Sequence, residues 1–130
     1  MPLLRIDAYR GRSKSEIAGL LDAIHLAVVE AFDVPERDRY QLYQEHEPGH
    51  LIVQDTGLGI ERSSRTIVIS MISRARATER KQAFYQLVVA KLAACGLRPE
   101  DIMVSVVVND DADWSFGLGR AQFLTGELAG

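Results

Sequence analysis

Apolar and polar positions alternate at both ends of the first third of the chain and follow a helical period between those ends. Alternation over residues 3–8 predicts a short strand that begins almost at the first residue. Ser13 and Glu16 have the spacing of a capping box, and the apolar stripe behind them predicts a helix over 14–32. A proline ends that helix, and renewed alternation over 39–46 predicts a second strand.

The second half of the chain repeats this order of elements. Residues 66–72 are almost all apolar and rich in β-branched side chains, which is typical of a strand that is covered on both faces. We expect Thr78 to cap a second helix, whose end is marked by Gly96. Another β-branched run over 102–108 predicts the fourth strand.

Prolines and glycines interrupt the chain between its two halves, where only residues 51–53 offer a possible short edge strand. The junctions after the two helices resemble each other, with Pro35 and Pro99 lying 64 positions apart, which indicates an internal repeat. We therefore predict one domain made of two strand-helix-strand repeats. Its predicted parts are repeat one at about 2–46, a connecting segment at about 47–65, repeat two at about 66–109 and a carboxyl-terminal tail at 110–130.

The predicted fold class is α+β. Parallel strands within each right-handed β-α-β unit, with the two units side by side, give a four-stranded mixed sheet with both helices on one face. The strands at 66–72 and 102–108 are too apolar to leave the other face in water, and no third layer remains in the sequence to cover it. We expect oligomerisation to provide that cover.

Composition narrows the choice of partner and compartment. The 130 residues carry 15 Lys and Arg against 18 Asp and Glu, so the chain lacks the basic excess expected of a protein that binds nucleic acid or an anionic membrane. The expected partner is a small molecule or a protein. The single cysteine, Cys95, excludes an intrachain disulfide. With no signal-peptide core near the start and no apolar run of membrane-spanning length, the sequence predicts a cytoplasmic protein.

The histidines include one misleading motif match. The segment His46-Glu47-Pro48-Gly49-His50 satisfies the H-E-x-x-H pattern of zinc proteases, but that pattern requires both histidines on one face of a helix. Pro48 and Gly49 make the segment a turn, so we expect exposed loop histidines and no metal site. His25, in the first helix, is a candidate general base, although a surface or hydrogen-bonded buried histidine is the simpler interpretation.

Four charged or ionisable positions carry candidate chemistry. Removal of Met1 would leave Pro2 as a secondary amine at the head of a strand. Arg74 and Arg76 follow the inner strand two residues apart, so they point to the same side near the start of the second helix. The start of a helix already carries a positive partial charge, so two arginines there are poorly placed to stabilise the helix but well placed to bind an anion. Asp38 lies in the turn before the second strand. Taken alone, the arginine pair and Asp38 are each simpler to interpret as solvated surface charge, and Met-Pro is a common start of a chain.

The tail contains an apolar group within otherwise polar, glycine-rich sequence. Its members are Trp114, Phe116, Phe123 and Leu128, and the first two belong to the segment Asp-Trp-Ser-Phe-Gly at 113–117. By residue type alone, this group covers either the core or a subunit interface.

Taken together, these segments resemble the tautomerase superfamily, and the similarity runs over essentially the whole chain. It is carried by Pro2 at the head of a strand, the Pro-Glu-Arg-Asp segment that ends at Asp38, the arginine pair, and the Asp-Trp-Ser-Phe-Gly segment. Within the superfamily the chain is most similar to the malonate semialdehyde decarboxylases, because of the arginine spacing in Ser73-Arg74-Ala75-Arg76. The other segments are widespread and identify the branch rather than the reaction.

The resemblance implies a homotrimer with sites near subunit boundaries, no metal and no organic cofactor. The implied reaction is loss of CO2 from a small 3-oxo acid, with malonate semialdehyde giving acetaldehyde. Catalytic roles are implied for Pro2, Asp38, Arg74 and Arg76, of which the two arginines also bind the carboxylate. The implied apolar pocket wall consists of Trp114, Phe116, Phe123 and Leu128.

Two alternatives stay open. A tautomerase, hydratase or dehalogenase on the same scaffold would act on small unsaturated or 2-oxo acids without requiring release of CO2. A non-enzymatic interaction protein would bind its partner equally well when Pro2 is blocked. The charge around Pro2 decides between the decarboxylase and the tautomerase: Asp38 raises the pKa of the Pro2 amine and favours an acid, whereas the arginines lower that pKa and favour a base. The decarboxylase resemblance implies the cationic form.

Overall fold

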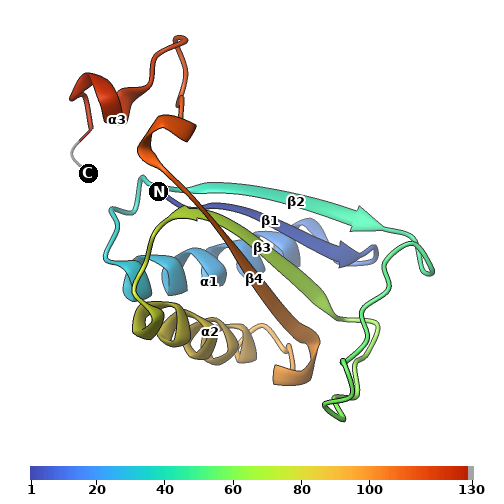
Figure 1. Cartoon of the computed structure of the whole chain (residues 1–130). Helices are drawn as coiled ribbons and strands as arrows, with labels where there is room; N and C mark the ends of the chain where they lie inside the picture. Colours follow the sequence, from blue (N-terminus) through green and yellow to red (C-terminus); the bar gives the residue numbers. More distant parts are fainter. Residues whose placement is uncertain (129–130) are drawn as a thin grey trace.

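A computed structural model describes residues 1–128 and contains a four-stranded sheet backed by two long helices (Figure 1). The strands are β1 (Leu3–Tyr9), β2 (Tyr40–His46), β3 (Ile67–Arg74) and β4 (Ile102–Asn109). The long helices are α1 (Lys14–Phe32) and α2 (Thr78–Ala93), and the tail adds the short helix α3 (Gln122–Thr125). One-turn helices lie at Pro99–Asp101 and Asp111–Asp113.

The strand order is β2-β1-β3-β4. β1 pairs with β2 in parallel and β3 pairs with β4 in parallel, while the central pair β1 and β3 is antiparallel. Both long helices cover the same face of this sheet (Figure 1). The predicted α+β class, with a four-stranded mixed sheet and two helices on one face, is therefore confirmed.

The core lies between that sheet face and the helices. Alternate residues of β1 and β3, such as Ile6 and Ile69, are fully buried there, as the two-residue period of a strand requires. Phe32 of α1 and Phe84 of α2 join the helices across this core, with ring centroids 5.3 Å apart. The predicted capping box at Ser13 is present and holds the start of α1.

The opposite sheet face is open and partly apolar. The sheet register places Leu42, Ile72, Met103 and Val107 on this face, and all four side chains are exposed in the single chain. Such a patch is typical of a surface that another subunit covers. Within residues 1–128, no helix combines the length and the apolar character needed to cross a bilayer.

Two local predictions are wrong. Thr78 is the first residue of α2 rather than its cap, because Ala77 occupies the capping position and offers no side-chain oxygen. Residues 51–53 form no strand. The carbonyl oxygen of Leu51 accepts a hydrogen bond from the hydroxyl of Tyr9, at 2.7 Å, rather than from the backbone of a neighbouring strand. The connecting segment instead crosses over the end of the sheet where β1 stops and β3 starts (Figure 1).

Candidate active site

The antiparallel pairing of β1 with β3 brings the start of the chain to the end of β3. Leu3 lies opposite Ile72 in this pairing, so the residues just before β1 meet those just after β3. Pro2 is buried at this position. The amine of Met1 lies 3.5 Å from Oδ2 of Asp38, which approaches from the turn before β2.

A backbone hydrogen bond within its turn, rather than hydrogen bonds to both carboxylate oxygens, positions Asp38. The residue is 6% exposed, and its amide donates to the carbonyl of Pro35 at 3.0 Å. His25 steadies the same turn, because its Nε2 lies 2.7 Å from the carbonyl oxygen of Glu36. Among the described residues, Oδ2 of Asp38 accepts no hydrogen bond. A buried charge with unused hydrogen-bonding capacity is costly unless a ligand or the amine completes it.

Arg74 and Arg76 reach the same place from the end of β3. Nη1 of Arg74 donates to Oδ1 of Asp111 at 2.8 Å, and Nε of Arg76 donates to Oγ of Ser73 at 3.1 Å. Within residues 1–128, Nε of Arg74 and Nη2 of Arg76 are buried without a hydrogen-bond partner. Two cations that keep buried donors free are suited to an anion with several acceptor oxygens.

Aromatic faces fix both guanidinium groups. Arg74 lies over the ring of Phe123 at 4.1 Å from its centroid, and Arg76 lies over Phe32 at 5.3 Å. Ring faces attract cations, so these contacts hold each guanidinium group without occupying further N–H donors. Burial lowers the pKa of Arg76, the neighbouring Arg74 lowers it further, and Asp38 opposes both effects. Arginine nevertheless stays charged near neutral pH.

The amine at the start of the chain is in a mixed electrostatic environment. Burial is the largest influence and lowers the pKa of the Met1 amine, and Arg76 and Arg74 lower it as well. The negative charge of Asp38 raises that pKa without overcoming the other effects. The same charges surround the Pro2 nitrogen when that residue is first in the chain, since it is the next residue.

Two neighbouring cavities open at this end of the sheet. One, of about 660 Å³, is lined by the arginine pair, the residues that follow β4, and Leu124 of α3. The other, of about 420 Å³, is lined mainly by Leu3, Tyr40, Ile72, Trp114 and Phe116. Asn109 belongs to both linings, so the charged and the apolar cavity meet at that residue.

The apolar wall is an aromatic stack held by a polar clamp. Trp114 and Phe116 lie nearly parallel, with centroids 5.5 Å apart and an interplanar angle of 7°, and Phe123 meets Phe116 edge-on at 5.5 Å. The indole nitrogen of Trp114 donates to Asn109 at 2.8 Å. The side chain of Gln122 accepts from the amide of Phe116 at 2.9 Å, and thereby fixes the tail against the stack.

The structure thus gathers most of the residues proposed from the sequence at one end of the sheet. The amine end, Asp38, Arg74 and Arg76 form the charged cluster. Trp114 and Phe116 line the apolar cavity, and Phe123 lies under Arg74. Leu128 lines neither cavity; its amide donates to the carbonyl of Gln122 at 3.2 Å.

Sequence reasoning missed three supporting residues. Ser73 accepts from Arg76, Asp111 pairs with Arg74, and Asn109 accepts from Trp114. Only Asp111 had a usable signal, since an acidic run directly after a strand lies at the same sheet edge as the arginines. His46, expected as an exposed loop residue, ends β2 and lies 2.7 Å from Oδ1 of Asp7.

Comparisons of the sequence with protein families agree along the chain. One family model described as a tautomerase enzyme matches residues 2–61, and a second with the same description matches residues 38–117. A probable tautomerase of Bacillus subtilis (strain 168), YrdN, is 54% identical over 129 residues, which cover 98% of this chain and 100% of YrdN.

Comparisons with solved structures find similar folds at high and at low sequence identity. A crystal structure of malonate semialdehyde decarboxylase superposes with a TM-score of 0.96 at 50% identity, covering 98% of this chain and 99% of that one. The symmetric trimer of a fused 4-OT superposes with a TM-score of 0.78 at 21% identity, covering 95% and 98% of the two chains. The second similarity concerns the fold alone.

Proposed function

The chain belongs to the tautomerase family, and on that premise we propose that it is a cofactor-independent decarboxylase of small 3-oxo acids, converting malonate semialdehyde to acetaldehyde and CO2. The observation that carries this proposal is the convergence of Asp38, Arg74 and Arg76, with unused buried hydrogen-bonding atoms, on the amino-terminal end of the chain. The 50% identity to a malonate semialdehyde decarboxylase supports the choice of substrate.

Pro2 is the proposed catalytic amine. Removal of Met1 turns its nitrogen from a non-basic amide into a secondary amine beside Asp38. In its cationic form, this amine donates a hydrogen bond to the substrate carbonyl oxygen. In its neutral form, it attacks that carbonyl instead and, with uptake of a proton and loss of water, forms an iminium. Either way, the carbonyl becomes a better acceptor for the electrons released when CO2 leaves.

Arg74 and Arg76 bind and turn the substrate carboxylate. Charge-assisted bonds from their free donors hold it out of the plane of the carbonyl group, so that the breaking bond aligns with the carbonyl π system. The electron pair of the bond between C1 and C2 then moves toward the carbonyl oxygen, CO2 departs, and the resulting enolate takes up one proton at C2. The product is acetaldehyde.

The aromatic wall of Trp114, Phe116 and Phe123 assists the departure of an uncharged molecule. An apolar surface solvates a carboxylate poorly and CO2 well, so it favours the direction of decarboxylation. The implied place of Leu128 in this wall stays a prediction. The sequence-based expectation that neither a metal nor an organic cofactor takes part also belongs to this proposal.

A second candidate, a tautomerase that uses neutral Pro2 as a general base, is favoured by one observation. Burial and the two arginines lower the pKa of the Met1 amine, and the same surroundings favour the neutral form of a Pro2 amine once Met1 is removed. Such an enzyme would act on 2-oxo or unsaturated acids. Hydratase and dehalogenase reactions on the same scaffold belong to this alternative.

We also propose that the chain assembles as a homotrimer. The open sheet face exposes Leu42, Ile72, Met103 and Val107, and a fused 4-OT with the same fold forms a symmetric trimer. A subunit on this face buries those side chains and removes apolar surface from water. The cytoplasmic location, and the expectation that neither nucleic acid nor a membrane is a partner, stay predictions from the sequence.

The decisive experiment is a panel of small acids tested with the wild-type protein and Pro2→Ala. The panel contains malonate semialdehyde, a 2-oxo acid, an acetylenic acid and a haloacrylate, with CO2 release and substrate loss measured separately. Intact mass first establishes that Met1 has been removed. We expect CO2 release only from malonate semialdehyde, with kcat/KM about 10²–10⁴-fold lower in Pro2→Ala.

Arg76→Ala provides the matched test of carboxylate binding, and Arg39→Ala controls for loss of one arginine. Arg39 pairs with Asp22 at 2.8 Å, outside both cavities. Undiminished CO2 release in both Pro2→Ala and Arg76→Ala contradicts the mechanism. Turnover of the 2-oxo acid without CO2 release identifies the tautomerase instead. No turnover of any panel member supports the non-enzymatic alternative.

A further inference from the structure

The internal repeat contains a second pair of arginines. A shift of 64 positions places Arg10 on Arg74 and Arg12 on Arg76, and it places the start of β1 at Leu3 on the start of β3 at Ile67. The pair is therefore present once in each repeat, with the same spacing at the end of the corresponding strand. Because β1 and β3 are antiparallel, the two pairs lie at opposite ends of the sheet.

The contacts of the two pairs also correspond. Nε of Arg10 lies 2.9 Å from Oε2 of Glu47, the residue after β2, just as Arg74 contacts Asp111 shortly after β4. Arg12 donates from Nη2 to the carbonyl oxygen of Arg65 at 2.8 Å. Its Nε is buried without a hydrogen-bond partner among the described residues, as is Nη2 of Arg76.

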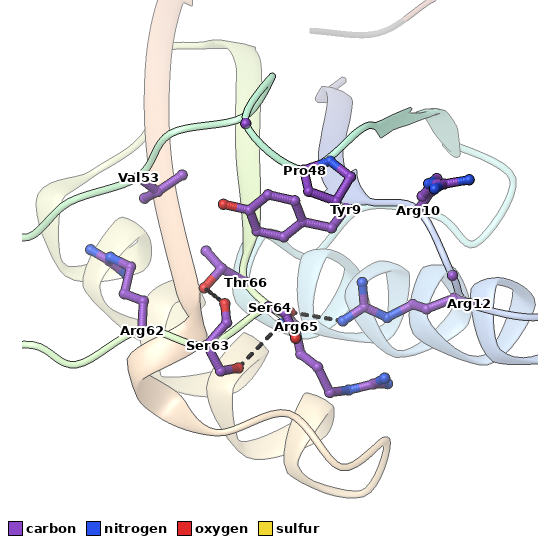
Figure 2. A pocket seen from close by; sticks show the side chains of 12 residues that line it. Tyr9, Arg10, Arg12, Pro48, Val53, Arg62, Ser63, Ser64, Arg65 and Thr66 are labelled. Carbon is purple, nitrogen blue, oxygen red and sulfur yellow. Dashed lines mark hydrogen bonds between the residues drawn. The ribbon is translucent and has the colours of Figure 1, made fainter.

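A cavity of about 540 Å³ opens beside this second pair (Figure 2). Four arginines line it and no acid does: Arg10, Arg12, Arg62 and Arg65. Arg62 donates to the carbonyl oxygens of Gln54 and Glu100, and Arg65 reaches Glu16 only at 3.4 Å. The lining is strongly positive. Its arginines contact Glu47 and Glu16, and its Ser63 and Thr66 donate to Asp101, but none of these three acids lines the cavity.

The same cavity has an apolar side. Tyr9, Pro48 and Val53 line it, and Figure 2 shows the Tyr9 ring between Val53 and the side of Arg10 and Arg12. The hydroxyl of Tyr9 is already used, since it donates to the carbonyl oxygen of Leu51. A ring that offers only its apolar surface beside free guanidinium donors suits a carboxylate with a short apolar chain.

This end of the sheet lacks the reactive amine. The 64-residue shift places Thr66 on Pro2, and the nitrogen of Thr66 is a chain amide that donates to the carbonyl of Ser63 at 3.2 Å. Its hydroxyl donates to Asp101 at 2.9 Å. With no basic nitrogen beside the arginines, the site can hold an anion but supplies no acid or base of the kind proposed for Pro2.

We propose that the cavity lined by Arg10, Arg12, Arg62 and Arg65 is a second, non-catalytic binding site for a small carboxylate. The carboxylate lies against Arg12 and Arg10, and its apolar part lies against Tyr9 and Val53. The choice of a carboxylate rests on the function proposed for Arg74 and Arg76, whereas the cavity and its charge do not depend on it.

The test is an NMR titration of the full-length protein with malonate, which is unreactive. Amide signals of Gly11 and Ser64 report on this cavity, and those of Ala75 and Ala112 report on the candidate active site. We expect both groups to shift in a saturable way. Arg12→Ala weakens binding at Gly11 and Ser64 by about tenfold or more and leaves the Ala75 response unchanged.

Three variants make the result specific. Arg76→Ala gives the reverse pattern, with a weaker response only at the Ala75 end, and Arg39→Ala changes neither response. Arg12→Gln replaces Arg12→Ala if the alanine variant does not fold. An unsaturable response at Gly11 and Ser64, or one that survives both Arg12 variants, overturns the proposal.

Two further outcomes separate this site from its premises. Inorganic phosphate that binds at Gly11 as tightly as malonate overturns the carboxylate class. Saturable malonate binding at Gly11 in a protein that turns over no acid supports this site while the proposed enzymatic function fails. Turnover of malonate semialdehyde with no response to malonate at Gly11 supports the proposed enzymatic function and overturns the second site.

Discussion

Each end of the central strand pair carries a buried acid just before an outer strand, and the two acids differ in their hydrogen bonds. Asp101, before β4, is 1% exposed and accepts from the amide and hydroxyl of Ser63, both at 2.6 Å, from Thr66 at 2.9 Å and from Arg98 at 3.2 Å. Asp38, before β2, is 6% exposed and its Oδ2 accepts no hydrogen bond among the described residues.

A buried carboxylate whose oxygens are all hydrogen-bonded stabilises the fold, whereas one with a free oxygen is available to a ligand. Burial alone would raise the pKa of Asp101, yet hydrogen bonds from Arg98, Ser63 and Thr66 hold that pKa far below its ordinary value. The folded state therefore stabilises the charged form. At Asp38, the proposed function assigns the unused hydrogen-bonding capacity to the amine and the substrate, so we expect loss of this acid to affect turnover rather than folding.

Asp101→Ala gives the largest expected effect. It leaves Arg98, Ser63 and Thr66 without their shared acceptor, so the free energy of unfolding falls by about 3–5 kcal/mol. Urea unfolding at one protein concentration measures this, because an oligomer's stability depends on concentration. A loss as small as that of a surface substitution contradicts the structural role of Asp101.

The same acid predicts the pH dependence of stability. The folded-state pKa of Asp101 lies below its unfolded value, so its contribution is complete above the unfolded value of about 4 and is lost as the pH falls further. Wild-type stability should therefore decline below about pH 4 more steeply than that of Asp101→Asn. Parallel declines would show that other carboxylates control acid unfolding.

Asp38→Asn is expected to reduce kcat/KM by about 10²–10³-fold, which corresponds to about 2.7–4 kcal/mol. The amide keeps the shape of the carboxylate but loses the charge that raises the pKa of the amine, so the pH profile of kcat should also shift to lower pH. Unfolding in urea should change little. Equal losses in stability for Asp38→Asn and Asp101→Asn would remove the distinction between the two ends.

Two serines give the smallest contrast. Ser63→Ala removes one hydrogen bond to Asp101 and should lower the free energy of unfolding by about 1.5 kcal/mol without changing KM. Ser73→Ala removes the acceptor of Arg76 Nε, so the guanidinium is less well fixed, and KM should rise by about tenfold or less. The two variants serve as controls for each other, and a rise in KM for Ser63→Ala would contradict the separation.

The fold was largely predictable because its signals are local and periodic. The capping box and apolar stripe define α1, and the alternation and β-branched runs define the four strands. The errors lie where a tertiary contact decides. The carbonyl oxygen of Leu51 accepts its hydrogen bond from Tyr9, which lies 42 positions earlier in the sequence.

The candidate site was predictable in its residue types but not in its support. The spacing of Arg74 and Arg76 predicts that they share a side, yet nothing local indicates that Phe123 and Phe32 lie beneath them. The second arginine pair shows the same limit. Arg10 and Arg12 gain meaning only when the antiparallel pairing of β1 and β3 turns a repeat in sequence into two opposite ends of one sheet.

The buried start of the chain has a practical consequence for anyone who produces this protein. Pro2 is buried, and the Met1 amine lies 3.5 Å from Oδ2 of Asp38. An affinity tag fused at this end would keep the Pro2 nitrogen in a peptide bond and place additional residues beside Asp38, Arg74 and Arg76. Under the function proposed for Pro2, preparations intended for activity assays therefore need their tag at the carboxyl end, and an inactive amino-terminally tagged sample does not test that proposal.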